Sequence, residues 1–92
     1  MPSPHPRAVV SARIQLSVTD LVSVQRVLVM LTGRNHSFTH FEAEEAGGGQ
    51  WRLTLDTVGA RTALELLEAR LLRLASVLTV EVTWTGSLTA AG

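Results

Sequence analysis

The chain has 92 residues, with eight basic and eight acidic side chains, three histidines and no cysteine. This length supports one domain with a modest core, because a chain of this size buries roughly 60–65% of its unfolded surface. The balanced charge gives no support for a nucleic-acid or membrane surface, and the lack of cysteine excludes disulfides and thiolate metal sites. No apolar run reaches the roughly 18–20 residues that span a bilayer, so we expect a cytoplasmic protein.

The two ends of the chain differ from its middle in composition. Residues 1–7 contain three prolines and no apolar stretch of the kind that a signal peptide needs. Residues 86–92 are small and polar. We therefore expect a disordered lead over 1–7, one domain over 8–85 and a flexible tail over 86–92.

The first strand is predicted over residues 9–18, where apolar and polar side chains alternate. The apolar side chains on its inner face are Ala12, Ile14, Leu16 and Val18. Thr19 or Asp20 can cap the segment that follows, because either side chain can accept a backbone N–H. The first strand should therefore lead directly into a helix.

The first helix is predicted over residues 21–31, from an apolar stripe at helical spacing. The stripe consists of Leu21, Val24, Val27, Leu28 and Leu31. Gly33 or Asn35 can adopt the left-handed conformation that commonly ends a helix.

The second strand is predicted to start near His36 and to contain a bulge. Phe38 and Phe41 have opposite strand parity, so both can face the core only if an extra residue lies between them. The three glycines at 47–49 then predict a hairpin loop or a flexible tip.

The second half of the chain repeats the order strand, helix, strand. Residues 51–56 alternate, and Gly59 is predicted to form a turn. A helix is predicted over 60–75, with a stripe of Ala63, Leu64, Leu67, Leu71 and Leu74. The last strand is predicted over 77–84, with Leu78, Val80, Val82 and Trp84 facing inward.

These elements predict an α+β fold in which every strand has one apolar face and every helix one apolar stripe. The economical arrangement is a ferredoxin-like βαββαβ sandwich, a four-stranded antiparallel sheet with two helices on one face. Trp51 and Trp84 share the parity of the apolar strand faces, so we expect them in the core rather than on a base-stacking platform.

Two loops supply a candidate ligand-binding site. Its residues are Thr19, Asp20, Leu21 and Val22 from the first loop, and Asn35, His36 and Ser37 from the second. At a dimer seam, the free N–H groups of the helix start would hold a carboxylate, and Asp20 would meet an ammonium group. The alternative is an ordinary helix cap and an ordinary turn.

A metal site is conceivable in the second strand, because His36, His40, Glu42 and Glu44 share one parity and are ligand types. The expected bulge would break this shared face. We therefore expect solvated edge residues and no metal.

Candidate catalytic groups are scarce. Glu65 and Glu68 could act as an acid–base pair, but they lie among arginines on the expected solvated face, where Arg61 can pair with Glu65. Acylphosphatases share the βαββαβ plan and bind phosphate with a glycine-containing loop and an arginine, and residues 19–24 contain neither. No nucleophile–base pair is evident. We expect a non-enzyme with no catalytic residues and no cofactor.

The second strand is also a candidate dimer edge, because it lies at the edge of a ferredoxin-like sheet. Residues 36–41 contain no proline, lysine or arginine, which natural monomers use to block edges. The candidate edge residues are Ser37, Phe38, Thr39, His40 and Phe41. We expect a homodimer through this strand. The polar open face of the sheet is either solvated or docks onto another sheet or a partner subunit.

Three runs of sequence, residues 25–34, 38–43 and 67–80, carry a resemblance to a known family. They are similar in order and spacing to ACT domains, and the closest similarity is to the small regulatory subunit of acetolactate synthase. Larger members have a second, C-terminal domain, so the chain resembles the short, ACT-only form. The resemblance implies a regulatory subunit of branched-chain amino-acid biosynthesis, with a large catalytic subunit as partner and an amino acid as possible effector.

The chain departs from effector-binding members of that family at three positions. Those members carry Asn, Gly and Asn where this chain has Thr19, Val22 and Ser37. A glycine lets the backbone approach a carboxylate closely, and Val22 places a branched side chain there. We therefore expect weak or no binding of valine. The alternatives to a regulatory subunit are a free-standing amino-acid sensor and, last, a small enzyme of the acylphosphatase type.

Overall fold

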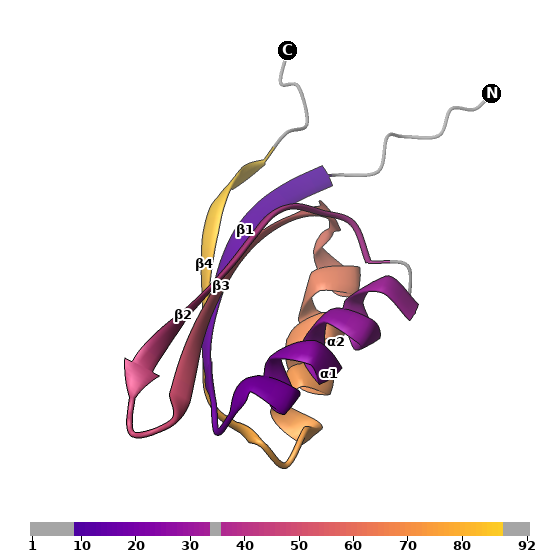
Figure 1. Ribbon diagram of the computed structural model, residues 1–92. Helices are drawn as coiled ribbons and strands as arrows, with labels where there is room; N and C mark the ends of the chain where they lie inside the picture. Colours follow the sequence, from indigo (N-terminus) through magenta and orange to yellow (C-terminus); the bar gives the residue numbers. More distant parts are fainter. Residues whose placement is uncertain (1–8, 34–35, 88–92) are drawn as a thin grey trace, which may run out of the picture.

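Two helices cover one face of a four-stranded antiparallel sheet in the computed structural model, which describes residues 9–33 and 36–87 (Figure 1). The elements in chain order are β1 (Val9–Val18), α1 (Leu21–Gly33), β2 (Phe38–Gly47), β3 (Gln50–Ala60), α2 (Arg61–Arg73) and β4 (Val77–Ser87). The strand order is β2-β3-β1-β4. This confirms the predicted ferredoxin-like fold.

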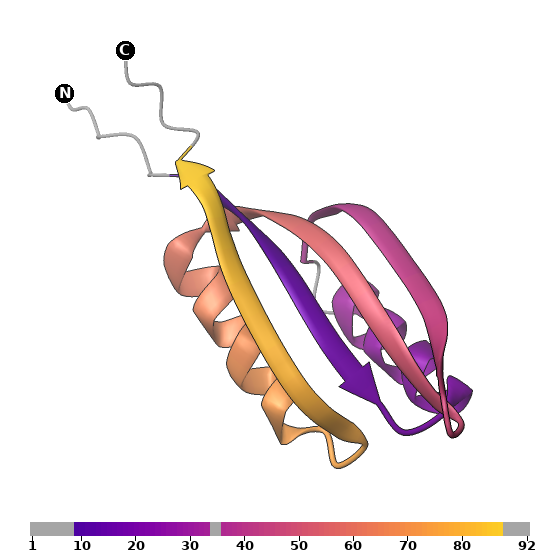
Figure 2. The ribbon, with the colours of Figure 1, turned by 90° about the vertical axis from the view of Figure 1, so that its left-hand side faces the viewer.

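The helices lie side by side behind the sheet, α2 on the side of β4 and α1 on the side of β2 (Figure 2). The core between the layers is formed by Ile14, Leu16, Val18, Val24, Val27, Leu31, Leu53, Leu55, Leu67 and Leu71. On the inner face of β1, Ala12, Ile14, Leu16 and Val18 are at most 1% exposed, as the alternation in the sequence predicts. No helix of the described residues lies on the other face of the sheet (Figure 2).

The predicted bulge in β2 is present. Phe38 pairs with Thr57 and His40 pairs with Asp56, so Thr39 is the extra residue. Both phenylalanines are half-buried against the core, with ring centroids 6.2 Å apart. The bulge thus reconciles their opposite parity in the sequence.

The glycines at 47–49 form the hairpin loop that the sequence predicts. Gly47 pairs with Gln50, which leaves a two-residue turn of Gly48 and Gly49 with φ angles of 62° and 81°. Positive φ at both central residues is what a type I′ turn requires, and glycine adopts it without steric cost.

Helix α1 buries fewer of its apolar residues than its stripe predicts. Val24, Val27 and Leu31 are buried, but Leu21 and Leu28 are 51% and 38% exposed, and Ser23 is buried instead. Ser23 tolerates burial because its hydroxyl donates a hydrogen bond to Asp20 Oδ1 at 2.7 Å. The prediction that Leu21 and Leu28 face the core is wrong.

The end of α1 also differs from the prediction. Gly33 belongs to the helix and is not among the glycines with positive φ. The His36 N–H donates to the Leu31 carbonyl at 3.0 Å, a bond that spans five residues as in a Schellman motif. Asn35, the other predicted helix terminator, lies outside the described residues.

The β3–α2 junction is tighter than expected. Gly59 is not a turn, because it pairs with Val10, and β3 continues to Ala60 before α2 starts at Arg61. The ten residues of β1 are paired along their whole length, which keeps β3 extended. In α2, Leu64, Leu67 and Leu71 are buried as predicted, whereas Ala63 is exposed.

The pairing of β4 with β1 is also irregular near Leu78. Ser17 pairs with Thr79 and Val18 with Val77, so Leu78 is an extra residue and is 48% exposed. Val77 packs against the core in the place predicted for Leu78. Trp84 is half-buried, and the Arg61 guanidinium lies 4.2 Å from its ring centroid.

The predicted boundaries at the chain ends are tested only in part. Residues 86 and 87 belong to β4, two residues beyond the expected domain boundary. The expected lead over 1–7 and residues 88–92 lie outside the described part. Within that part, neither helix has the length and hydropathy to cross a membrane.

Candidate functional site

The two loops of the predicted ligand site lie at opposite ends of α1 (Figure 1). Thr19 and Asp20 precede the helix, whereas His36 and Ser37 follow it. A 13-residue helix is about 20 Å long, so a single chain does not bring the loops together. Such a site would need the first loop of one copy and the second loop of another.

Asp20 caps α1. Its Oδ1 accepts hydrogen bonds from the Ser23 backbone N–H at 2.9 Å and the Ser23 hydroxyl at 2.7 Å. The Ser23 hydroxyl bond, followed by the backbone bond, lowers the pKa of Asp20 from its ordinary value. The Thr19 N–H donates to the Ser76 carbonyl at 3.1 Å, which ties this loop to the α2–β4 connection. The Asp20 carboxylate therefore already serves the helix start.

The predicted dimer edge is an outer strand of the sheet. Strand β2 pairs with β3 on one side, and no strand of the described residues lies on the other. Ser37, Thr39 and His40 are exposed, and Phe38 and Phe41 are half-buried.

The histidine and glutamate side chains of β2 make a local pair. His40 Nε2 and Glu42 Oε1 are 3.1 Å apart, and both side chains are exposed. Among the described residues, no group of three or more His, Asp or Glu is placed to hold a metal ion.

The open face of the sheet is a lattice of polar side chains whose rows follow from the strand register. One row contains Glu44, Arg52, Ser17 and Thr79, the next Glu42, Thr54, Gln15 and Glu81, and the third His40, Asp56, Arg13 and Thr83. In the third row, Arg13 donates two hydrogen bonds to Asp56, at 2.8 and 3.1 Å. These bonds lower the pKa of Asp56 and raise the pKa of Arg13.

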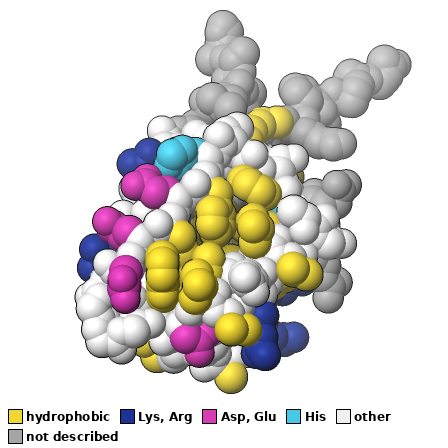
Figure 3. All heavy atoms as spheres, in the orientation of Figure 1, with side chains coloured by type: hydrophobic (Ala, Val, Ile, Leu, Met, Phe, Trp, Pro, Cys, Tyr) yellow, Lys and Arg dark blue, Asp and Glu magenta, His cyan; other side chains and the backbone are white. Residues whose placement is uncertain are grey.

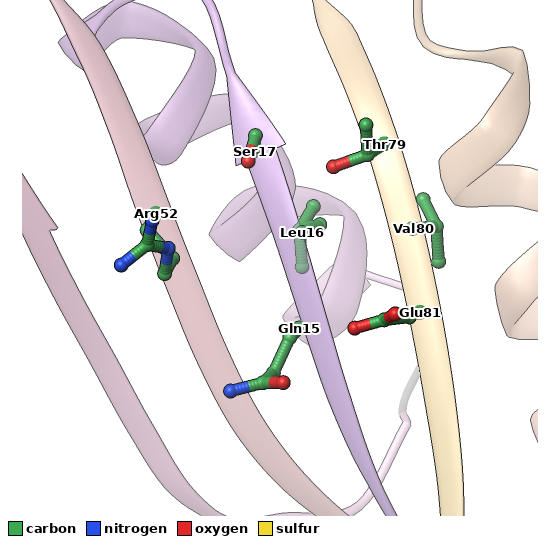
Figure 4. Close-up of a pocket in the computed structure, with 7 residues that line it drawn as sticks. All are labelled: Gln15, Leu16, Ser17, Arg52, Thr79, Val80 and Glu81. Atoms are coloured by element: carbon green, nitrogen blue, oxygen red, sulfur yellow. The ribbon is translucent and has the colours of Figure 1, made fainter. Parts of the chain in front are cut away.

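An open hollow of about 520 Å³ lies over the β3, β1 and β4 parts of the first two rows, near the end of β1 (Figure 4). Gln15, Ser17, Arg52, Thr79 and Glu81 supply its polar lining, and Leu16 and Val80 complete it. The sequence predicts that these polar side chains share a face, but not that they border a hollow. The parity of each strand is visible in the sequence, whereas the register between strands is not.

Solved structures with the same fold come from proteins of low sequence identity. An uncharacterized protein from Thermotoga maritima superposes with a TM-score of 0.72 at 13% identity, covering 84% of this chain and 98% of that one. The ACT domain from GTP pyrophosphokinase of Chlorobium tepidum gives 0.70 at 18%, covering 82% and 99%. The C-terminal domain of the MgtC protein from Mycobacterium tuberculosis gives 0.65 at 17%, covering 88% and 93%. The chain shares its fold with ACT domains.

The likeness to ACT domains is one of fold. No family model and no curated protein matches the sequence. The ACT part of the predicted resemblance therefore gains structural support, and its narrower part, the acetolactate synthase small subunit, stays a prediction.

The lowered pKa values of Asp20 and Asp56 predict a stability that depends on pH. A carboxyl whose folded pKa is depressed stabilises the fold above its unfolded pKa of about 3.9, and this contribution is lost as pH falls through the folded value. We expect the urea midpoint to fall from pH 5 to pH 2.5. Asp56→Asn should reduce this fall. An equal fall in the wild type and Asp56→Asn would contradict the assignment.

Proposed function

We propose that this chain is a non-catalytic regulatory module that acts as a homodimer. We further propose that it regulates the large catalytic subunit of an acetolactate-synthase-like enzyme in branched-chain amino-acid biosynthesis. The observation that carries the proposal is the surface formed by the outer side of α1 and the edge of β2.

The outer surface of α1 is unusually apolar for a helix that faces water. Leu21, Val22, Leu28 and Val29 are 51%, 55%, 38% and 67% exposed. A surface helix usually carries polar residues opposite its core stripe. Hydrophobic side chains gather on the face of the molecule that carries α1 and β2 (Figure 3). This surface favours a partner that covers the helix.

The helical geometry places the two leucines of this set on the side of α1 that faces away from α2, called here the leucine flank. Leu21 and Leu28 are seven residues apart and therefore share one side of the helix. Met30 lines a small hollow with Arg70 and Leu74, so its side of α1 faces α2. Because successive residues rotate by about 100°, Leu28 points away from Met30. The leucine flank thus lies toward the β2 edge.

Pairing β2 with the same strand of a second copy would cover both features at once. The two sheets would join into one of eight strands, and the leucine flanks of the two α1 helices would meet beside the seam. The acidic residues Glu42, Glu44 and Glu45 of β2 all lie on the C-terminal side of Thr39. A twofold axis near Thr39 would place the acidic segments of the two copies at opposite ends of the seam, which avoids like charges facing each other.

The catalytic partner is inferred from the sequence resemblance. A regulatory module that binds one conformation of an enzyme more tightly shifts the enzyme toward that conformation. Valine is an unfavoured effector, because Asp20 is engaged as a cap and Val22 occupies a position where effector-binding relatives have glycine.

The test is reconstitution with a purified acetolactate synthase large subunit from the same source. We expect co-elution on gel filtration and a change in kcat of about tenfold, with no further effect of valine. The unfolded variant Leu67→Asp serves as the control for non-specific binding. A large subunit that neither co-elutes with the chain nor changes its rate would contradict the partner assignment, and a strong valine effect would contradict the interpretation of Val22.

A further inference from the structure

We propose that the facing flanks of α1 and α2 bind an acidic amphipathic segment of a partner protein. These flanks, called here the inter-helix surface, lie on the helical side of the molecule, away from the open sheet face (Figure 2). The surface consists of Arg26 and Met30 from α1, and Leu66, Arg70, Arg73 and Leu74 from α2. The inference goes beyond the proposed dimer and does not depend on it, because the leucine flank lies on the other side of α1.

A small hollow between the helices identifies the flanks that face each other. Met30 of α1 lines it together with residues near the C-terminal end of α2. Arg26 precedes Met30 by four residues, so it lies on the same flank of α1. Leu66 precedes Arg70 by four residues and Arg73 by seven, so these three share one flank of α2. The two helices thus present arginines and apolar side chains toward the same space.

Helical spacing divides the charges of α2 between its two flanks. Arg70 and Arg73 lie on the flank that faces α1. Glu65 precedes Glu68 by three residues and Leu72 by seven, so these three lie on the opposite flank. Helix α1 contains no acidic residue. The inter-helix surface therefore carries three arginines and no carboxylate.

The three arginines have no carboxylate partner in the part of the chain that the structure describes. Each of the other arginines there has a carboxylate neighbour within 4.0 Å. Arg26, Arg70 and Arg73 form neither an ion pair nor a hydrogen bond with a described residue. A guanidinium carries five N–H donors in a fork that matches a carboxylate. Their side chains can therefore bind carboxylates supplied from outside.

The space between the helices is not filled by their own side chains. Both helices pack on the sheet and make few contacts with each other. The hollow measures about 270 Å³, which is below the roughly 300–1,000 Å³ of small-molecule sites. Met30 and Leu74 give it an apolar lining, and methionine adapts its shape to what it packs against. These features suit one anchoring side chain of a protein partner.

The mixture of arginines and apolar side chains favours an acidic amphipathic segment over a polyanion. A nucleic acid would gain from the arginines but not from Met30, Leu66 or Leu74. The whole chain also has no net charge, whereas nucleic-acid binding surfaces are strongly basic. A helical segment with an apolar stripe between carboxylates gains from both kinds of side chain.

The experiment is a fluorescence anisotropy titration of the chain into a labelled acidic peptide. The peptide has about 16 residues, to match the length of the two helices, with leucines at helical spacing and glutamates beside them. We expect a dissociation constant on the order of 10–100 μM. Binding should weaken about tenfold at about 0.5 M NaCl, because salt screens exposed charges. The same peptide with glutamine for glutamate should bind at least about tenfold more weakly.

Matched variants locate the peptide on the chain. Arg26→Gln and Arg70→Gln should each weaken binding about fivefold, whereas Arg52→Gln, which removes the same charge from the open sheet face, should leave it unchanged. Leu66→Ala should weaken binding about fivefold, whereas Leu72→Ala, on the opposite flank of α2, should not.

Four results would overturn the proposal. The first is no binding of the acidic peptide at about 1 mM chain. The second is a loss of binding in Arg52→Gln as large as in Arg70→Gln. The third is equal binding of a peptide of the same composition whose leucines are scattered around the helix, because the contact would then need no apolar stripe. The fourth is tighter binding of a single-stranded DNA of about 20 nucleotides, which would make the surface a polyanion site.

Discussion

Leu67→Asp is expected to unfold the domain, whereas the same substitution at the neighbouring position, Leu66→Asp, is expected to leave it folded. Leu67 is 0% exposed and packs in the core between α2 and the sheet. Leu66 is 48% exposed on the outer side of the same helix. The two variants have the same chemistry and nearly the same place in the helix, so any difference between them comes from burial.

The expected size of the effect follows from the stability of a small domain. A chain of 92 residues has a free energy of unfolding of about 5–14 kcal/mol. Removing a buried leucine side chain costs about 2–5 kcal/mol, and an unpaired buried charge costs more than the cavity alone. Circular dichroism and urea unfolding of the two variants measure this difference. A cooperative transition of Leu67→Asp at the wild-type urea concentration would contradict the core assignment.

The alternation of strands predicts the fold well, because each strand has one face on the core and one on water. The bulge in β2 is predictable for the same reason, since two phenylalanines of opposite parity both gain from burial. Leu78 is mispredicted because strict alternation along β4 assigns it to the inner face. In the structure Val18 pairs with Val77, so Val77 takes the inner position and Leu78 is the extra residue. The register between two strands cannot be read from the sequence of either strand alone.

The helices show a second limit of sequence patterns. Leu21 and Leu28 fit the apolar stripe of α1, but only Val24, Val27 and Leu31 of that stripe are buried in the core. In the sequence, an apolar residue that stays exposed beside the core cannot be distinguished from one that is buried in it. The candidate sites also differ in how far the sequence predicts them. The cap role of Asp20 is among the predicted alternatives, whereas the hollow around Ser17 depends on the register of three strands.

Leu28→Glu is expected to convert the proposed dimer into a monomer without unfolding the domain. In a twofold interface each substitution occurs twice, so the two new carboxylates would face each other across the seam where the leucine flanks meet. Thr39→Lys is expected to have the same effect, because a lysine on an edge strand opposes pairing with another strand. We expect the dissociation constant of the dimer to rise at least about 100-fold in each variant, which corresponds to about 2.8 kcal/mol.

Matched controls separate a loss of dimerisation from general damage to the fold. Leu72→Glu places the same charge on an exposed leucine of α2, and Thr83→Lys places the same charge on the other edge strand, β4. Both controls should stay dimeric in light scattering at about 100 μM, a concentration far above a micromolar dissociation constant. If Leu72→Glu and Thr83→Lys dissociate the dimer and Leu28→Glu and Thr39→Lys do not, the interface lies at β4 and α2. A wild-type chain that is monomeric at this concentration would rule out the edge-paired dimer altogether. The leucine flank of α1 and the edge of β2 would then stay exposed to water and would not be covered by a second copy of the chain.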